Sequence, residues 1–255
     1  MQIDMFELLE EPPIKIKIFA DTASLKDIVE SSKNTNIKGW TTNPTLMKQA
    51  GVTDYKRFAK DVIEHLSENR PDTCLSLEVF ADDEKEMYRQ ALEVASWSKN
   101  DYKVYVKIPV MNSKGRDNYE LMSRLQDEGV LVNATAVFTN IQIQNCLDYL
   151  DVYKCKSIIS VFAGRIADTG VDPCKIIANN IANRNLDISY RSEFLWASTR
   201  EVYNVKQAIA CGADIITMTP DLIKKIELFN KDLNKYSLET CQMFYNDSIS
   251  SGFKI

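Results

Sequence analysis

The chain has 255 residues, 45% of them hydrophobic and 26% charged, which is ordinary for a soluble globular protein. Its net charge of −5, without any block of Lys and Arg, argues against nucleic acid and anionic membranes as partners. No apolar run is long enough to cross a bilayer and the acidic start does not resemble a signal peptide, so we expect a cytoplasmic protein without membrane contact.

Eight short runs rich in β-branched and aromatic residues alternate with amphipathic segments along the chain. The predicted strands cover residues 14–20, 37–42, 74–80, 103–110, 130–138, 157–163, 193–198 and 214–219. The predicted helices cover residues 24–33, 54–68, 83–98, 115–128, 139–150, 172–184, 200–210 and 220–230. This alternation, without a Pro/Gly/Ser-rich linker, predicts one α/β domain over residues 1–255, a (β/α)8 TIM barrel. A doubly wound open sheet stays an alternative because periodicity does not show closure, although no GxGxxG follows the first strand.

Both ends of the chain fall outside this pattern. Residues 1–13 are expected to form an N-terminal arm. Residues 231–255 are polar and aromatic, and we expect them to form an extra helix that covers the barrel or a neighbouring subunit.

Cysteine and histidine usage limits the chemistry that the chain can perform. Only one histidine, His65, is present, and its helical, charged surroundings predict a surface position. The six cysteines form no CxxC pair and are predicted to be reduced thiols; they are Cys74, Cys146, Cys155, Cys174, Cys211 and Cys241. We therefore predict no metal site, and acid–base work would fall to carboxylates, lysines, tyrosines or water.

A lysine interrupts the apolar run "YVKIPV" at residues 105–110. On an exposed edge strand Lys107 would be harmless, with its stem on the surface and its ammonium in water. In a buried strand, desolvation disfavours the charged form of an amine, lowers its pKa and makes a nucleophile. On that second interpretation we expect Lys107→Ala to spare the fold, because it would leave no buried charge behind.

Polar residues stand at the predicted carboxyl ends of seven strands, where barrel enzymes carry their chemistry. They are Asp21, Thr41, Thr42, Asn43, Glu78, Lys107, Asn133, Thr135, Ser160, Arg165, Ser198 and Arg200. Each one alone is more often a helix cap or a turn residue, as Asn43 before proline and Asp21 would be. A set that points in one direction at seven strand ends favours an active site.

These residue types fit Schiff-base chemistry on a ketone. The amine of Lys107 would form an imine that draws electrons from the neighbouring carbon. Glu78 and Thr135 could move protons through a water, and Asp21 could take a proton from a hydroxyl group. The guanidinium groups of Arg165 and Arg200, with Ser198, suit a phosphate.

The strand-end motifs resemble those of the transaldolases, in the same order, over roughly residues 14 to 225. The motifs are "FADTAS", "GWTTNPTLM", "SLEVF", "YVKIPV", "VNATAVF", "SVFAGRI" and "WASTRE". The resemblance implies a class I aldolase-type barrel that needs no cofactor and no metal. It implies that Lys107 forms the Schiff base, Asp21 is the base, and Glu78 and Thr135 position the catalytic water. Substrate contacts would come from Asn43, Thr42, Asn133, Ser160 and Phe162, and a phosphate clamp from Arg165, Ser198 and Arg200.

Two positions bear on the choice between transaldolases and the related fructose-6-phosphate aldolases. Glu78 stands where transaldolases typically have glutamate and the aldolases glutamine. Phe162 stands where the aldolases have a tyrosine, whose hydroxyl could order a proton donor beside the enamine. Both positions favour a transaldolase that moves a dihydroxyacetone unit between sugar phosphates, as in the pentose phosphate pathway. A fructose-6-phosphate aldolase, a non-catalytic sugar-phosphate-binding barrel and a structural barrel with Lys107 on its surface remain the alternatives, and a homo-oligomer is left open.

Two features depart from the family pattern. Trp40 precedes "TTNP" where a small or aliphatic residue is usual. Residues 110–115 lie in the segment "IPVMNSKGRD" after Lys107, where family members commonly show a hydroxyl residue and an earlier glycine. That loop is expected to border the substrate mouth, so either feature could alter the choice of sugar.

Overall fold

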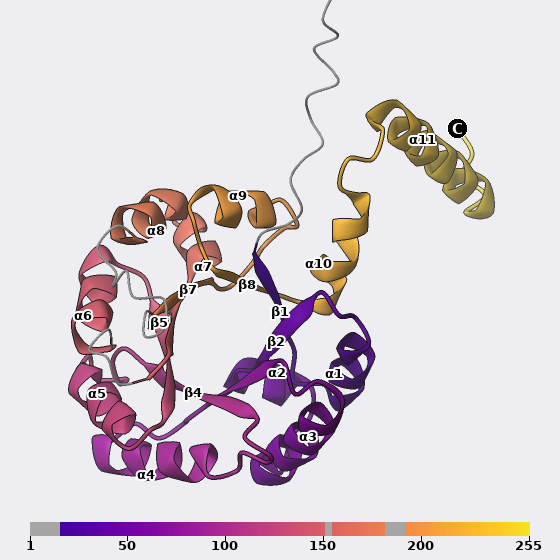
Figure 1. Cartoon of the computed structure of the whole chain (residues 1–255). Helices are drawn as coiled ribbons and strands as arrows, with labels where there is room; N and C mark the ends of the chain where they lie inside the picture. Colours follow the sequence, from indigo (N-terminus) through magenta and orange to yellow (C-terminus); the bar gives the residue numbers. More distant parts are fainter. Residues whose placement is uncertain (1–15, 151–154, 182–191) are drawn as a thin grey trace, which may run out of the picture.

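The computed structural model describes residues 16–150, 155–181 and 192–255, and its eight parallel strands close into a barrel in sequence order (Figure 1). The strands are β1 (Lys17–Asp21), β2 (Ile37–Thr41), β3 (Cys74–Glu78), β4 (Lys103–Pro109), β5 (Leu131–Val137), β6 (Ser157–Val161), β7 (Glu193–Trp196) and β8 (Ile215–Met218). Pairing of β1 with both β2 and β8 closes the sheet. The predicted (β/α)8 barrel is therefore confirmed, and the open-sheet alternative is wrong.

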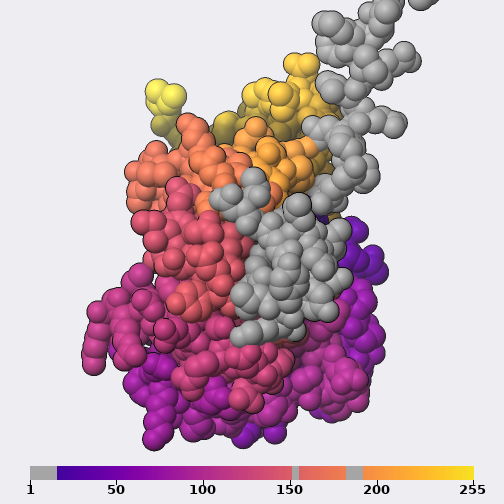
Figure 2. All heavy atoms as spheres, turned by 60° about the vertical axis from the view of Figure 1, so that its left-hand side comes forward, coloured from indigo at the N-terminus to yellow at the C-terminus, as the bar shows by residue number. Residues whose placement is uncertain are grey.

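Helices surround the strands and match the expected order. They are α1 (Leu25–Ser32), α3 (Tyr55–Asn69), α4 (Glu84–Ala95), α5 (Tyr119–Asp127), α6 (Asn140–Leu150), α8 (Pro173–Ile181), α9 (Asn204–Ala210) and α10 (Pro220–Lys224), the last continued by the 3₁₀ turn η1 (Lys225–Leu228). The predicted arm, and the parts of the predicted elements at residues 14–15 and 182–184, lie outside the described residues. In the space-filling view the purple N-terminal units lie at the bottom of the molecule, and the orange and yellow C-terminal units lie at the top (Figure 2).

Two short helices were not predicted: α2 (Pro44–Gln49) and α7 (Ala163–Ala167). Each begins within a few residues of a strand's carboxyl end, so it lies at the rim of the barrel where the polar motifs are. Because each is only five or six residues long, it shows too little periodicity to be recognised from sequence.

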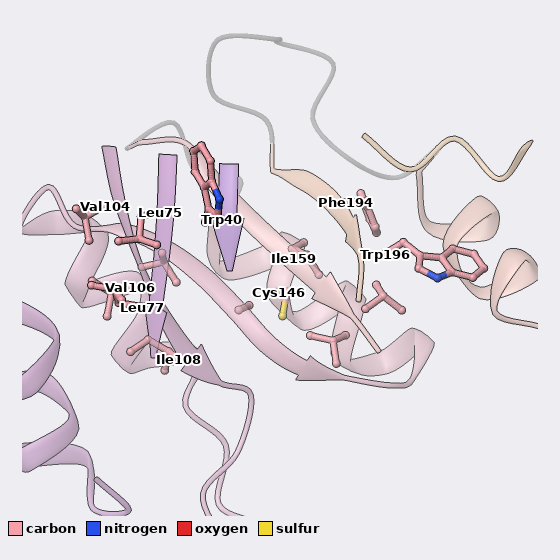
Figure 3. Packing of buried hydrophobic residues seen from close by; sticks show 14 of the residues in the cluster. Trp40, Leu75, Leu77, Val104, Val106, Ile108, Cys146, Ile159, Phe194 and Trp196 are labelled. Carbon is pink, nitrogen blue, oxygen red and sulfur yellow. The ribbon is translucent and has the colours of Figure 1, made fainter. Parts of the chain in front are cut away.

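Alternation along the strands explains why a lysine occurs in the apolar run of β4. Val104, Val106 and Ile108 belong to the large hydrophobic cluster between the barrel and its helices, where they pack beside Leu75 and Leu77 of β3 (Figure 3). The side chains of Tyr105 and Lys107 have the opposite parity and face the lumen. The apolar neighbours of Lys107 in sequence are therefore not its neighbours in the lumen.

A second apolar cluster fills the lower lumen. Its members come from most of the strands: Phe19, Cys74, Tyr105, Ile158, Leu195, Ala197 and Ile215. Gly39 leaves room for this layer, because a Cβ there would lie only 2.7 Å from the ring of Phe19. The polar set described below lies one or two pleats further along the same strands and forms the upper lumen.

Trp40 lies outside the lumen, in the hydrophobic layer between the strands and the helices, and is fully buried. Its indole Nε1 donates to Ser31 Oγ at 2.9 Å, and Arg70 lies over its ring at 5.9 Å. The guanidinium of Arg70 in turn donates to the carbonyl groups of Ser32, Asn34 and Ile37. Trp40 thus contributes to packing behind β2 and does not border the substrate mouth.

The chain ends in the helix α11 (Leu233–Ser250), which confirms the extra C-terminal helix. None of its residues is buried, and the helix stands clear of the barrel beyond α10 (Figure 1). It exposes Leu233, Leu238, Phe244, Tyr245 and Ile249, each by more than half. The expected cover over its own barrel is not formed, and cover over a neighbouring subunit remains a prediction. None of the described helices has the length and apolarity that spanning a membrane requires.

Candidate active site

Lys107 is buried in the upper lumen, with 5% of its surface exposed. Its Nζ lies 2.8 Å from Glu78 Oε2 and donates to the carbonyl oxygen of Thr42 at 2.8 Å. Strand register explains the pairing, because Glu78 of β3 and Asn133 of β5 lie directly beside Lys107 of β4. The surface-lysine alternative is therefore wrong, and the ammonium has a carboxylate partner.

The Thr42 hydroxyl does not face the lysine. It donates to the carbonyl oxygen of Ser76 at 3.3 Å, which leaves the Thr42 backbone to hold the amine. Thr42 is fully buried. Its position therefore fits orientation of Lys107 through the main chain, whereas direct substrate contact by its side chain stays a prediction.

Asp21 ends β1 on the other side of the lumen and receives a chain of hydroxyl hydrogen bonds. Thr41 Oγ1 donates to Asp21 Oδ1 at 2.7 Å and lies 2.6 Å from Thr217 Oγ1. Since Thr41 has one hydroxyl hydrogen, Thr217 must be the donor to Thr41 in this arrangement. Burial raises the pKa of the Asp21 carboxyl, while Lys107 and the Thr41 hydroxyl lower that pKa and Glu78 raises it. Asp21 therefore lies within electrostatic range of both members of the Lys107–Glu78 pair.

A second hydrogen-bond chain crosses the lumen from β3 to β6. Asn133 Nδ2 donates to Ser76 Oγ at 3.1 Å, and Ser160 Oγ donates to Asn133 Oδ1 at 2.7 Å. All three residues are buried. Ser76 and Asn133 belong to strands separated by β4, so they can meet only inside the barrel. The chain fixes the amide of Asn133 beside Lys107.

Thr135 carries a buried polar atom that lacks a partner. Its Oγ1 is buried and has no hydrogen-bond partner within the part of the chain that the structure describes. A hydroxyl left in this state costs about 1–3 kcal/mol unless a water or a ligand satisfies it. The β5 strand bulges directly after this residue, where Ala136 has φ +57° and the register with β6 shifts. Thr135 thus offers a free hydroxyl two residues above Asn133.

Asn43 has the local role that its position before proline allows. It caps α2, with its side-chain oxygen accepting from Leu46 N at 3.0 Å. The side-chain nitrogen keeps two hydrogens, and the residue is partly buried at the rim. Capping therefore does not prevent the predicted substrate contact, because the two functions use opposite ends of the amide.

The three predicted phosphate ligands lie on α7 and on the loop after β7. Phe162 precedes α7, and its ring lies 5.6 Å from the ring of Phe138 and 5.8 Å from the guanidinium carbon of Arg165. Arg165 and Arg200 are exposed, and Ser198 is half-buried with a left-handed φ of +63°. Phe162 therefore packs its ring against the Arg165 guanidinium, in addition to its predicted place beside the substrate.

Gly164 brings these two elements together. Its N–H donates to the Ala197 carbonyl at 3.3 Å, and a Cβ at this position would lie 1.7 Å from the Ser198 carbonyl oxygen. The same Cβ would lie 3.1 Å from Cγ of Arg200. Only glycine therefore lets the helix that carries Arg165 approach the loop that carries Ser198 and Arg200.

We expect Gly164→Ala to lower the free energy of unfolding by about 3 kcal/mol, because backbone atoms must move to admit the methyl group. Denaturant unfolding would measure the loss. Ala167→Gly in the exposed last turn of α7 is the matched control, and helix propensity alone predicts a loss of about 1 kcal/mol there. A Gly164→Ala protein as stable as the parent would contradict the close approach.

The loop after β4 is tied to the loop after β3. Ser113 donates to the Asp82 carboxylate through both its backbone N–H and its hydroxyl, each at 2.7 Å. Arg116 pairs with Glu84 at 3.1 Å. These contacts hold together the two loops that follow the strands of Glu78 and Lys107, and the place of residues 110–115 beside the substrate mouth stays a prediction.

Three polar residues of this region were not among the strand-end residues singled out from the sequence: Ser76, Thr217 and Asp168. Thr41 was among them but had no role assigned. Ser76 has the parity of Glu78 in β3, so period-two alternation within the strand could have revealed it. Asp168 lies three residues after Arg165 with no sequence signal of its own. No three His, Cys, Asp or Glu side chains in residues 16–150, 155–181 and 192–255 come together as metal ligands would.

Comparison with known proteins relates this geometry to a family. The family model described as Transaldolase/Fructose-6-phosphate aldolase matches residues 18–253. A protein named "Probable transaldolase" from Dehalococcoides mccartyi is 33% identical over 203 residues, which cover 80% of this chain and 86% of that protein. A protein of the same name from Brucella anthropi is 32% identical over 242 residues, or 94% of this chain and 100% of that protein.

Solved structures support the same fold at much lower identity. The structure titled "Native KDPGal structure" has a TM-score of 0.53 and 11% identity, and covers 82% of this chain and 84% of that one. A putative fructose-1,6-biphosphate aldolase from Coccidioides immitis has a TM-score of 0.55 and 10% identity, and covers 87% of this chain and 80% of that one. At these identities the likeness concerns the barrel alone.

Proposed function

The chain belongs to the Transaldolase/Fructose-6-phosphate aldolase family, and from this membership we propose that it is a transaldolase that works through a Schiff base on Lys107. The proposed reaction moves a dihydroxyacetone unit from a ketose phosphate to an aldose phosphate. The family includes two activities, so the choice of transaldolase rests on Glu78 and Phe162, as the sequence resemblance implies.

One observation carries the proposal: a lysine amine lies in the lumen within 2.8 Å of a carboxylate, and a second carboxylate lies nearby. A structural ion pair would need only Glu78. The presence of Asp21, whose pKa burial raises, adds a group suited to act as a base. Lys107 is also the only buried lysine in the described part of the chain.

Imine formation requires an uncharged amine. Glu78 is in contact with Nζ and can accept its proton, after which the amine nitrogen attacks the ketone carbon. The carbonyl oxygen takes up two protons, one from the attacking nitrogen and one from Glu78, and leaves as water, so that a protonated imine remains on Lys107. The unpartnered hydroxyl of Thr135 and the Glu78 carboxylate are the groups that would hold this water.

Cleavage then needs a base at the neighbouring hydroxyl. Asp21 takes the proton from the hydroxyl on the carbon that becomes the aldehyde, and the carbon–carbon bond breaks. The electron pair enters the imine and leaves a three-carbon enamine on Lys107. Addition of this enamine to a second aldehyde reverses the steps and returns the proton from Asp21.

Borohydride trapping tests the proposal directly. Reduction in the presence of fructose 6-phosphate should leave a three-carbon adduct on the peptide that contains Lys107, read by intact and peptide mass. Absence of any adduct with fructose 6-phosphate and sedoheptulose 7-phosphate, together with tight binding of either sugar, would instead favour a non-catalytic binding barrel. Steady release of free dihydroxyacetone without an acceptor would identify the aldolase activity.

The acid side of the pH profile should report Asp21. Burial raises the pKa of this carboxyl above the ordinary 3.8, and the base must be ionised, so kcat should fall at a higher pH than an ordinary aspartate would cause. The Thr41 hydroxyl lowers the same pKa, so Thr41→Val should move the acid limb to still higher pH. Single-turnover cleavage rates across pH would measure this shift, and a limb that stays in place or moves to lower pH would argue against Asp21 as the base.

A further inference from the structure

The Arg200 guanidinium is held by a carboxylate outside the predicted site. Arg200 Nε donates to Asp168 Oδ1 at 3.2 Å, and Arg200 Nη2 donates to Asp168 Oδ2. Asp168 follows the last turn of α7, three residues after Arg165. The two arginines of the predicted phosphate clamp are thus connected through one short helix.

The geometry of this pair leaves part of the arginine available. A guanidinium carries five N–H groups around a planar fork. Asp168 occupies the edge formed by Nε and Nη2, which uses one hydrogen of each. The end formed by Nη1 and Nη2 keeps three hydrogens, and this end matches two oxygens of a phosphate.

The backbone of the loop that carries Arg200 is fixed by separate hydrogen bonds. The Arg200 N–H donates to Asn204 Oδ1 at 2.9 Å, and Thr199 Oγ1 donates to the Thr217 carbonyl at 2.7 Å. Gly164 holds the same loop against α7. With the main chain fixed, the remaining freedom of Arg200 lies in its side chain, and Asp168 restrains its end.

We propose that Asp168 is a positioning residue that orients Arg200 for the phosphate group of the sugar substrate. This rests on the proposed function only in so far as the ligand carries a phosphate. An arginine that is already oriented loses less conformational freedom on binding, which strengthens the complex. The negative charge of Asp168 opposes a phosphate dianion, but both side chains are about half exposed, and water screens that repulsion.

The test compares Asp168→Asn and Asp168→Ala with the matched control Asp172→Asn. Asp172 is an exposed aspartate at the start of α8 that accepts from Cys174 N, and asparagine is an equally good cap there. The control therefore removes the same charge from the neighbouring turn without touching Arg200. Calorimetry with fructose 6-phosphate and with orthophosphate is the first readout, because it does not depend on turnover.

Both Asp168 variants should raise the Kd of each phosphate compound about fivefold, and Asp172→Asn should not. In turnover, the KM for fructose 6-phosphate should rise by a similar factor at unchanged kcat, while kcat/KM for unphosphorylated fructose stays the same. In an Arg200→Ala background, Asp168→Asn should have no further effect on Kd. Unchanged or tighter phosphate binding in the Asp168 variants would overturn the proposal, and so would an equal loss in the Arg200→Ala background. If the protein shows no turnover, the proposed function fails while the calorimetric comparison still decides the role of Asp168.

Discussion

Replacing Lys107 with alanine is expected to reduce turnover at least ~10⁴-fold and to remove the borohydride-trapped adduct entirely. The reaction requires a covalent imine, and no other lysine in the described residues is buried and could form it. Steady-state assay and peptide mass mapping would measure both effects. The control is Lys103→Ala, which removes an exposed lysine from the start of the same strand.

The structure corrects the expectation that this substitution would leave no charge behind. Lys107 is paired with Glu78, whose side chain is only 16% exposed, so Lys107→Ala leaves that carboxylate without its partner. We expect a loss of about 1–3 kcal/mol in the free energy of unfolding, since loss of one member of a buried pair is costly and Glu78 keeps some contact with water. Adding Glu78→Gln should recover part of this loss. Full activity in folded Lys107→Ala, or an adduct on another lysine, would refute the Schiff-base assignment.

Asp21→Asn should separate imine formation from cleavage. Removal of the base is expected to slow cleavage about 10²–10⁴-fold, whereas Lys107 and Glu78 remain to form the imine. Borohydride reduction with fructose 6-phosphate should then trap a six-carbon adduct on Lys107 in place of the three-carbon one. A three-carbon adduct formed at the parent rate would show that another group is the base.

The same substitution should stabilise the folded protein at neutral pH. Because burial raises the pKa of Asp21 above its unfolded value, the folded protein prefers the protonated form of this carboxyl. Stability from that proton is fully present below the unfolded pKa and is lost as the pH rises through the raised folded pKa. Asparagine keeps the acceptor for Thr41 and carries no charge, so Asp21→Asn should exceed the parent in stability at pH 7, with a difference that shrinks as the pH falls. Asp61→Asn, on the exposed face of α3, is the control and should show neither effect.

Several features of the site could be anticipated because they depend on local pattern. A lysine in "YVKIPV" is noticeable because its flanking valine and isoleucine belong to the opposite face of the strand. The same alternation indicates Glu78, Asn133 and Thr135 as lumen residues. Trp40 shows the limit of the same reasoning: it departs from the family pattern, yet its parity directs it to the helix layer, away from the substrate.

Other features depend on contacts between distant segments. The Thr217–Thr41–Asp21 chain joins β8, β2 and β1, and the Arg200–Asp168 pair joins two successive βα units. Neither α2 nor α7 is long enough for its periodicity to be seen. The exposed face of α11 likewise follows from the absence of contact with its own barrel, which composition alone does not reveal.

The sequence by itself determined the eight strand–helix units, the faces of their strands and the polar residues at their carboxyl ends, because period-two and helical patterns are properties of neighbouring residues. Only the tertiary structure decided that the sheet closes, that Glu78 is the partner of Lys107 and that Asp168 holds Arg200. The Lys107–Glu78 pair depends on the register between β3 and β4, which places side by side two residues 29 positions apart in the chain. The Arg200–Asp168 pair depends on the approach of α7 and the loop after β7, and its residues are 32 positions apart. The contacts between such residues form only when the barrel closes, and no local sequence pattern encodes them.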